Sequence, residues 1–218
     1  MSRYENERDA IVQEVAAELP ESREGLLKAA KKAVSDLNAA VMQNNVIAAG
    51  LADEKYQAVI WKLNGGSFFG SMANDGSAGR VVEDFCRAGV SEVPGWGQSG
   101  EFFIEVDEVQ ARVAFSSLGL GRVHYGFYVV DPSKPFISET GYRSHFAGWG
   151  GGRTVSQEAE RHFRTLLKDS FFPGVKPESP AVPEGFEIVD VVLPEHKAYI
   201  VKKWAAVAEA RIRVIQNS

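Results

Sequence analysis

The chain has 218 residues, of which 44% are hydrophobic and 24% are charged, and its formal net charge at pH 7 is −5. These values are ordinary for globular proteins and exclude collagen-like, low-complexity and wholly disordered chains. A single cysteine excludes an internal disulfide and favours a reducing compartment, so a cytoplasmic protein is expected. No signal peptide and no membrane-spanning run of about 18 apolar residues is visible in the sequence.

Apolar residues recur at helical spacing over residues 1–64, which predicts helices in this part of the chain. The first expected helix ends at Pro20, which cannot continue the hydrogen-bond ladder, and the second begins near Ser22. A third helix is expected over 53–63, after a short apolar piece over 46–51. The second helix carries one apolar stripe at helical spacing, formed by Leu26, Ala30, Val34, Leu37 and Val41, and places Lys31 and Lys32 toward water.

Over residues 101–142, apolar residues recur at every second position, which predicts an antiparallel β-meander. Asp107 and Glu108 would form the first hairpin tip, although neither is the glycine that tight hairpin turns favour. The expected strands cover 102–106, 109–115, 123–129 and 136–142.

The remainder of the chain alternates between segments rich in glycine or proline and expected helices. A glycine-rich loop leads to Thr154, which begins a helix through about Lys168, and four prolines make 171–185 an irregular connector before one more strand. A C-terminal helix over 194–217 carries a heptad seam, which either docks on the body or forms a homodimer. The predicted fold is therefore a single α+β domain over 1–218. It contains N-terminal helices, a three- to five-stranded mainly antiparallel sheet, a helix after the glycine-rich loop and a long C-terminal helix.

The net charge is unevenly distributed along the chain. Residues 65–120 hold 8 acidic and 3 basic residues, whereas 121–175 hold 5 acidic and 7 basic residues. The acidic part carries a cluster at Glu105, Asp107 and Glu108, which we interpret as a partner-binding surface for a basic protein. The alternative interpretation is a solvated hairpin tip.

The densest polar motif covers residues 138–154 and ends in glycines before a helix start. Glycines let backbone N–H groups approach an anion, and a helix N-terminus adds partial positive charge. A Walker A loop is excluded, because Ala147 replaces its first glycine and Arg153 replaces its lysine. The alternatives are a structural turn and an anion or nucleic-acid contact, for which the expected anion-binding residues are Arg143, Gly150, Gly151, Gly152, Arg153 and Thr154.

The sequence contains no recognised catalytic or metal-binding motif, and neither a cofactor nor a metal is expected. If the chain were an enzyme, its catalytic residues would come from the same motif, namely Glu139, Tyr142, Arg143 and His145.

Three functions are compatible with these patterns. The first is a binding or regulatory protein that engages a macromolecular partner, such as a phage- or plasmid-type accessory inhibitor of a host nucleic-acid enzyme. The second is a small enzyme acting on a phosphorylated or nucleic-acid substrate through residues 138–154. The third is a self-assembling protein that uses the C-terminal heptad seam. The absence of a catalytic motif favours the first function. The partner is then either a protein or a nucleic acid.

Overall fold

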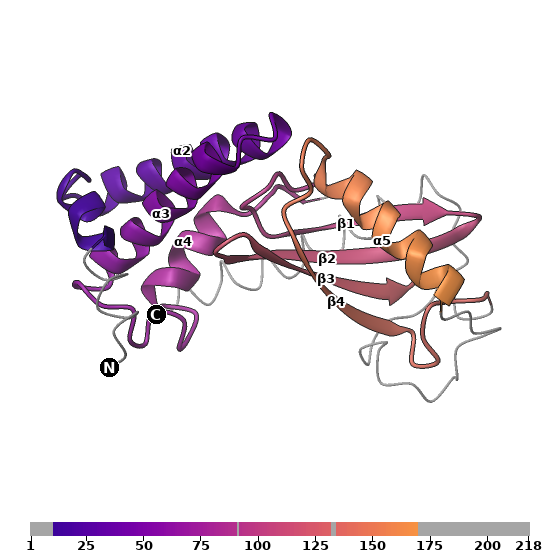
Figure 1. Ribbon diagram of the computed structural model, residues 1–218. Coiled ribbons are helices and arrows are strands. Elements are labelled where there is room, and N and C mark those ends of the chain that lie inside the picture. The colour runs from indigo at the N-terminus through magenta and orange to yellow at the C-terminus, as the bar shows by residue number, and fades with distance from the viewer. Residues whose placement is uncertain (1–10, 91, 132–133, 170–218) are drawn as a thin grey trace.

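The computed structural model describes residues 11–90, 92–131 and 134–169, which form an α+β fold with helices at one end and a sheet at the other (Figure 1). Residues 11–17 are helical. The elements that follow are α2 (Arg23–Met42), α3 (Val46–Leu63), α4 (Ala78–Cys86), β1 (Gly100–Val106), β2 (Val109–Gly119), β3 (Arg122–Val129), β4 (Tyr142–Gly148) and α5 (Val155–Asp169). The predicted connector over 171–185, the strand after it and the C-terminal helix with its heptad seam lie outside the described residues.

The N-terminal helices form one packed unit, which we call the helical unit and define as residues 11–86. Helix α2 begins after Ser22, whose Oγ accepts a hydrogen bond from Gly25 N at 3.1 Å. The five residues of the predicted stripe are all buried, and Lys31 and Lys32 are exposed. Helices α2 and α3 lie side by side (Figure 1). Six of their buried residues pack with residues 12–19 and α4 into one hydrophobic cluster, and five others pack into the cluster that includes the sheet.

Helix α3 differs from the prediction, because it runs unbroken from Val46 to Leu63 and does not begin near residue 53. Asn45 caps its start, with the side-chain oxygen accepting a hydrogen bond from Ala48 N at 3.0 Å. The prediction failed because Val46 and Ile47 are 72% and 79% exposed, so the first turn lacks the apolar period of a packed helix.

The sheet is an antiparallel meander in the order β1-β2-β3-β4. The predicted first hairpin is confirmed, since Val106 pairs with Val109 and leaves Asp107 and Glu108 as a two-residue turn. Both turn residues take positive φ values of 51° and 64°, the left-handed region in which side chains are strained and glycine is favoured.

The fourth strand was misplaced by the sequence analysis, since β4 covers Tyr142–Gly148 and not 136–142. Residues before it form a turn, in which Gly141 takes a φ of 70° and its N–H donates to Ser138 O at 3.3 Å. Strand β4 lies at an edge of the sheet and every one of its residues is exposed or only half-buried. It therefore lacks the apolar alternation that marks a half-buried strand.

Helix α5 crosses one face of the sheet (Figure 1). The ring of Phe163 packs against Phe127 of β3 and Phe136, with ring centroids 5.3 Å and 5.7 Å apart, inside the second hydrophobic cluster. On the opposite face, Arg112 lies over the Tyr128 ring at 4.1 Å and pairs with Glu101 at 2.7 Å. None of the described helices is long and apolar enough to cross a lipid bilayer.

Candidate nucleic-acid interface

Three amide side chains occupy the turn between α2 and α3. Gln43 caps the C-terminus of α2 through backbone hydrogen bonds to Ala39 O and Val41 O. Asn44 takes a φ of 55°, a conformation that asparagine tolerates better than most residues, and Asn45 caps α3. All three side chains are exposed, so capping leaves a polar, uncharged edge at the end of the helical unit.

The glycine-rich loop packs directly against this turn. Gly152 N donates a hydrogen bond to Val41 O at 2.9 Å, and a Cβ on Gly151 would lie 2.8 Å from Asn44 Oδ1. Gly152 takes a φ of 78°, a backbone conformation that favours glycine, and its loop thereby meets a segment about a hundred residues away in sequence. Residues 43–47 and 151–154 together form what we call the tip surface, which lies where the helices adjoin the sheet (Figure 1).

A buried tryptophan ties the loop to α2. Trp96 is fully buried, its backbone N–H donates to Asn38 Oδ1 at 2.9 Å, and its Nε1 donates to Arg153 O at 2.8 Å. This role was not predicted from the sequence, because Pro94 and the two flanking glycines indicated only a turn. A large aromatic residue between two glycines was the available signal, since such a side chain is rarely left in solvent.

The helix after the loop begins as predicted. Thr154 and Gln157 form a reciprocal capping box, in which Gln157 N donates to Thr154 Oγ1 at 3.2 Å and Thr154 N donates to Gln157 Oε1 at 2.9 Å. The positive end of the α5 dipole therefore lies beside the α2–α3 turn.

One buried carboxylate organises the charges on α5. Glu158 is only 1% exposed, and it accepts hydrogen bonds from Arg153 Nε and, at 2.8 Å, from Arg161 Nε. Burial alone would raise the pKa of Glu158, but hydrogen bonds from Arg161 and Arg153 outweigh it and hold the pKa below its usual value. Both guanidinium groups remain about half exposed, so part of each stays available to an anion.

A pair of histidines continues this polar cluster toward β4. His145 Nε2 lies 3.0 Å from His162 Nδ1, and His162 Nε2 lies 3.4 Å from Glu158 Oε2. Burial, together with His145 and the Arg161 charge, lowers the pKa of His162 to about 4, and burial likewise lowers the pKa of His145. Both imidazoles are therefore neutral at pH 7. The buried hydroxyl of Tyr125, whose ring packs on His162, has no hydrogen-bond partner in the described part of the chain.

The structure separates the residues that the sequence analysis grouped as catalytic. Tyr142 packs on Tyr128 on the open face of the sheet, whereas His145 contacts α5 on the other face. Arg143 influences His145 electrostatically, and Glu139 lies exposed in the turn before β4. The four side chains do not line one common site.

The two arginines of the predicted anion site are also separated along α5. Arg143 lies opposite Phe127, which packs on Phe163, while Arg153 precedes the helix. The eight residue-to-residue steps from Val155 to Phe163 span roughly 12 Å of helix. Arg153, Thr154 and the glycines belong to the loop and helix start beside the α2–α3 turn, whereas Arg143 lies beside the second half of α5.

The acidic cluster lies away from the tip surface. Glu105, Asp107 and Glu108 occupy the β1–β2 hairpin, at the end of the sheet opposite the helical unit (Figure 1). Glu105 accepts a hydrogen bond from Gln110 Nε2 at 2.9 Å across the hairpin. Its role as a partner-binding surface stays a prediction.

Two family models match most of the chain. Residues 11–85 match the KlcB N-terminal DNA-binding domain, and residues 99–204 match the KlcB third domain. The chain belongs to the KlcB family. This confirms the plasmid part of the functional prediction, and it places the helical unit within the DNA-binding domain of the family.

Curated relatives support the KlcB assignment. A protein KlcB of Escherichia coli is 42% identical over 230 residues, which cover 92% of this chain and 57% of that protein. A second E. coli protein KlcB is 40% identical over 240 residues, covering 94% of this chain and 52% of that protein. The KlcB-family chain thus spans just over half the length of these relatives. The TrfB transcriptional repressor protein of E. coli is 63% identical over 30 residues, 14% of this chain and 30% of TrfB. No solved structure matches the chain.

Proposed function

We propose that this KlcB-family chain is a DNA-binding regulatory protein that contacts DNA through the tip surface. The observation that carries the proposal is the hydrogen bond from Gly152 N to Val41 O, within a chain whose residues 11–85 match a DNA-binding domain. This contact unites the exposed start of α3 with a loop that carries Arg153 and the N-terminus of α5.

The start of α3 has the chemistry of a base-reading element. Its cap, Asn45, is exposed, and Val46, Ile47 and Leu51 are 72%, 79% and 62% exposed on the first two turns. Neighbouring apolar side chains exposed together mark interaction surfaces. Amide side chains pair with adenine edges and apolar side chains contact thymine methyl groups in the major groove, where a helix presents its N-terminal residues.

The loop side of the tip surface has the chemistry of a phosphate contact. The guanidinium of Arg153 is half exposed, and the N-terminus of α5 directs partial positive charge to the same surface. Such contacts fix the orientation of the protein on DNA, while α3 would read the bases. Inhibition of a host nucleic-acid enzyme stays a prediction.

Fluorescence anisotropy with a mixed-sequence duplex, measured with the full chain over a salt series, tests the proposal. Arg153→Gln should weaken binding and reduce the salt slope by about one, because one phosphate contact is lost. Ile47→Ala should weaken binding without changing the slope. Arg164→Gln, an exposed arginine farther along α5, is the matched control. If Arg153→Gln and Ile47→Ala both bind like the parent chain, with circular dichroism showing them folded, the tip surface is not the DNA site.

A further inference from the structure

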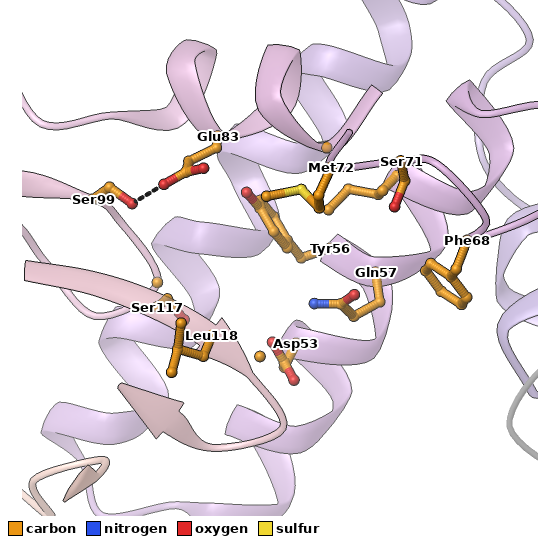
Figure 2. Close-up of a pocket in the computed structure, with 14 residues that line it drawn as sticks. Asp53, Tyr56, Gln57, Phe68, Ser71, Met72, Glu83, Ser99, Ser117 and Leu118 are labelled. Carbon is orange, nitrogen blue, oxygen red and sulfur yellow. Dashed lines mark hydrogen bonds between the residues drawn. The ribbon is translucent and has the colours of Figure 1, made fainter. Parts of the chain in front are cut away.

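The hairpin between β2 and β3 is attached to α3. Gly119 pairs with Arg122, which leaves a two-residue turn formed by Leu120 and Gly121. Leu120 N donates a hydrogen bond to Asp53 Oδ2 at 2.7 Å, and Asp53 is only 5% exposed. Figure 2 shows Asp53 beside the end of β2, among the residues that line a cavity of about 200 Å³. The hairpin tip is therefore held beside the second turn of α3.

The two glycines of the hairpin bring it close to its neighbours on both sides. A Cβ on Gly119 would lie 2.8 Å from Gln57 Nε2, farther along α3. A Cβ on Gly121 would lie 3.8 Å from the ring of Trp149, which comes just before residues 151–154 of the tip surface. The hairpin thus adjoins both α3 and the loop that carries the other half of the tip surface.

The residue at the hairpin tip does not suit its backbone conformation. Leu120 takes a φ of 54° and Gly121 a φ of 73°, the pair of positive values that defines a type I′ turn. Asparagine and glycine adopt the first of these positions readily, whereas leucine is strained there. Packing does not compensate, because Leu120 is 67% exposed. An exposed apolar side chain on a strained tip points to contact with another molecule.

The hairpin shares a side of α3 with the exposed start of that helix. Val46, Gly50 and Asp53 follow at intervals of four and three residues, so they lie on one side of α3. Val46 is 72% exposed, and a Cβ on Gly50 would meet no atom within 4 Å. From Val46 to the hairpin contact at Asp53 is about 10 Å of helix. The surface between the start of α3 and the hairpin is therefore open.

We propose that the β2–β3 hairpin inserts Leu120 into the minor groove of DNA, beside the major-groove segment that α3 reads. This inference rests on the proposed function, which places the start of α3 in the major groove. That groove is about 12 Å wide, so an element about 10 Å along the helix meets the groove rim and the adjacent minor groove. Leucine is among the apolar side chains that proteins insert between base steps from the minor groove.

The charge of the hairpin agrees with a DNA contact. Residues 118–124 contain Arg122 and no acidic residue. Arg122 is exposed at the start of β3, directly after the turn, where it can contact a phosphate at the groove rim while Leu120 enters the groove.

Fluorescence anisotropy of the full chain with an A·T-rich duplex tests the proposal through Leu120→Gly. Glycine suits the positive φ, so the melting temperature of this variant should equal or exceed that of the parent chain. Its DNA affinity should nevertheless fall by about threefold or more, because the inserted side chain is lost. Arg122→Gln should also weaken binding and reduce the salt slope by about one. Arg143→Gln, an exposed arginine at the opposite end of the β3–β4 pair, is the matched control and should bind like the parent chain.

Netropsin, a ligand of the minor groove at A·T pairs, identifies the groove. When netropsin saturates the duplex, insertion is blocked, so the parent chain and Leu120→Gly should bind it with equal affinity. A difference that persists in netropsin would place Leu120 outside the minor groove and overturn the proposal.

The two proposals fail in different ways. A parent chain that does not bind duplex DNA refutes the proposed function and the hairpin contact together. Weaker binding by Arg153→Gln with parent-like binding by Leu120→Gly leaves the tip surface as the DNA site and refutes the insertion. Weaker binding by both variants, with Arg143→Gln unchanged, supports both proposals.

Discussion

The neutral histidine pair makes stability depend on pH in a defined direction. His162 has an ordinary pKa of 6.5 when unfolded and about 4 in the fold, where burial, His145 and Arg161 disfavour its charged form. Its side chain is only 14% exposed, so solvent screens these effects weakly. Between these pKa values the unfolded chain binds more protons than the folded chain. The free energy of unfolding therefore falls as the pH falls through this window.

The magnitude follows from the two pKa values. Titrating one group with these values from pH 7 to pH 5 lowers the free energy of unfolding by about 2 kcal/mol, and the full difference approaches about 3 kcal/mol below pH 4. Glu158 acts in a lower window, because its pKa lies below the usual 4.5, so its contribution is lost only as the pH falls through that depressed value. The interval from pH 7 to pH 5 therefore isolates the histidines.

Urea unfolding at several pH values, compared between the parent chain and His162→Gln, measures the effect. Glutamine remains neutral throughout, so the variant should lose about 2 kcal/mol less between pH 7 and pH 5 than the parent chain. Nuclear magnetic resonance titration of the His162 ring provides the folded pKa directly. A ring that titrates near 6.5, or equal losses in the two proteins, would refute the reasoning.

Four further outcomes are expected. Glu108→Gly should raise the free energy of unfolding by about 1 kcal/mol in urea titrations, because glycine adopts the positive φ of the hairpin without strain. Thr154→Ala should lower it by about 1 kcal/mol through loss of the α5 cap, and Thr154→Ser should largely preserve it. Trp96→Phe should lower it by about 1–3 kcal/mol, since the hydrogen bond to the Arg153 carbonyl is lost; a thermal melt equal to that of the parent chain would contradict this. Burial raises the pKa of Cys86 to about 11, so a thiol reagent at pH 8 should label the folded chain far more slowly than the chain in urea.

Much of the fold followed from short-range patterns. The stripe of α2, the β1–β2 hairpin and the capping box of Thr154 each depend on a few neighbouring residues, and each was predicted correctly. The errors at the start of α3 and in β4 share one cause. Both segments are largely exposed. Their sequences therefore lack the regular spacing of apolar residues that marks a helix or strand packed against a core.

The tip surface required information that no local pattern holds. The local sequence motif predicted the glycines and Arg153 as a contact for an anion, but it grouped them with Arg143 and not with the α2–α3 turn. Their actual neighbours are set by tertiary contacts, namely the hydrogen bond of Gly152 to Val41 and that of Trp96 to Arg153. Each joins residues more than fifty positions apart, and a single sequence gives no indication of such pairs.

The charge of the helical unit restricts how it can bind DNA. Residues 11–85 contain 10 acidic and 7 basic residues, and Lys28 and Lys32 already pair with Glu24 and Asp36 on α2. Proteins that depend on phosphate neutralisation make about six to ten such contacts and lose affinity steeply with salt. A net acidic unit favours fewer contacts, so under the proposed function DNA binding would depend on a few phosphate contacts from the tip surface together with base readout. The logarithm of the binding constant should therefore fall with the logarithm of salt concentration at a slope of only about −2 to −3.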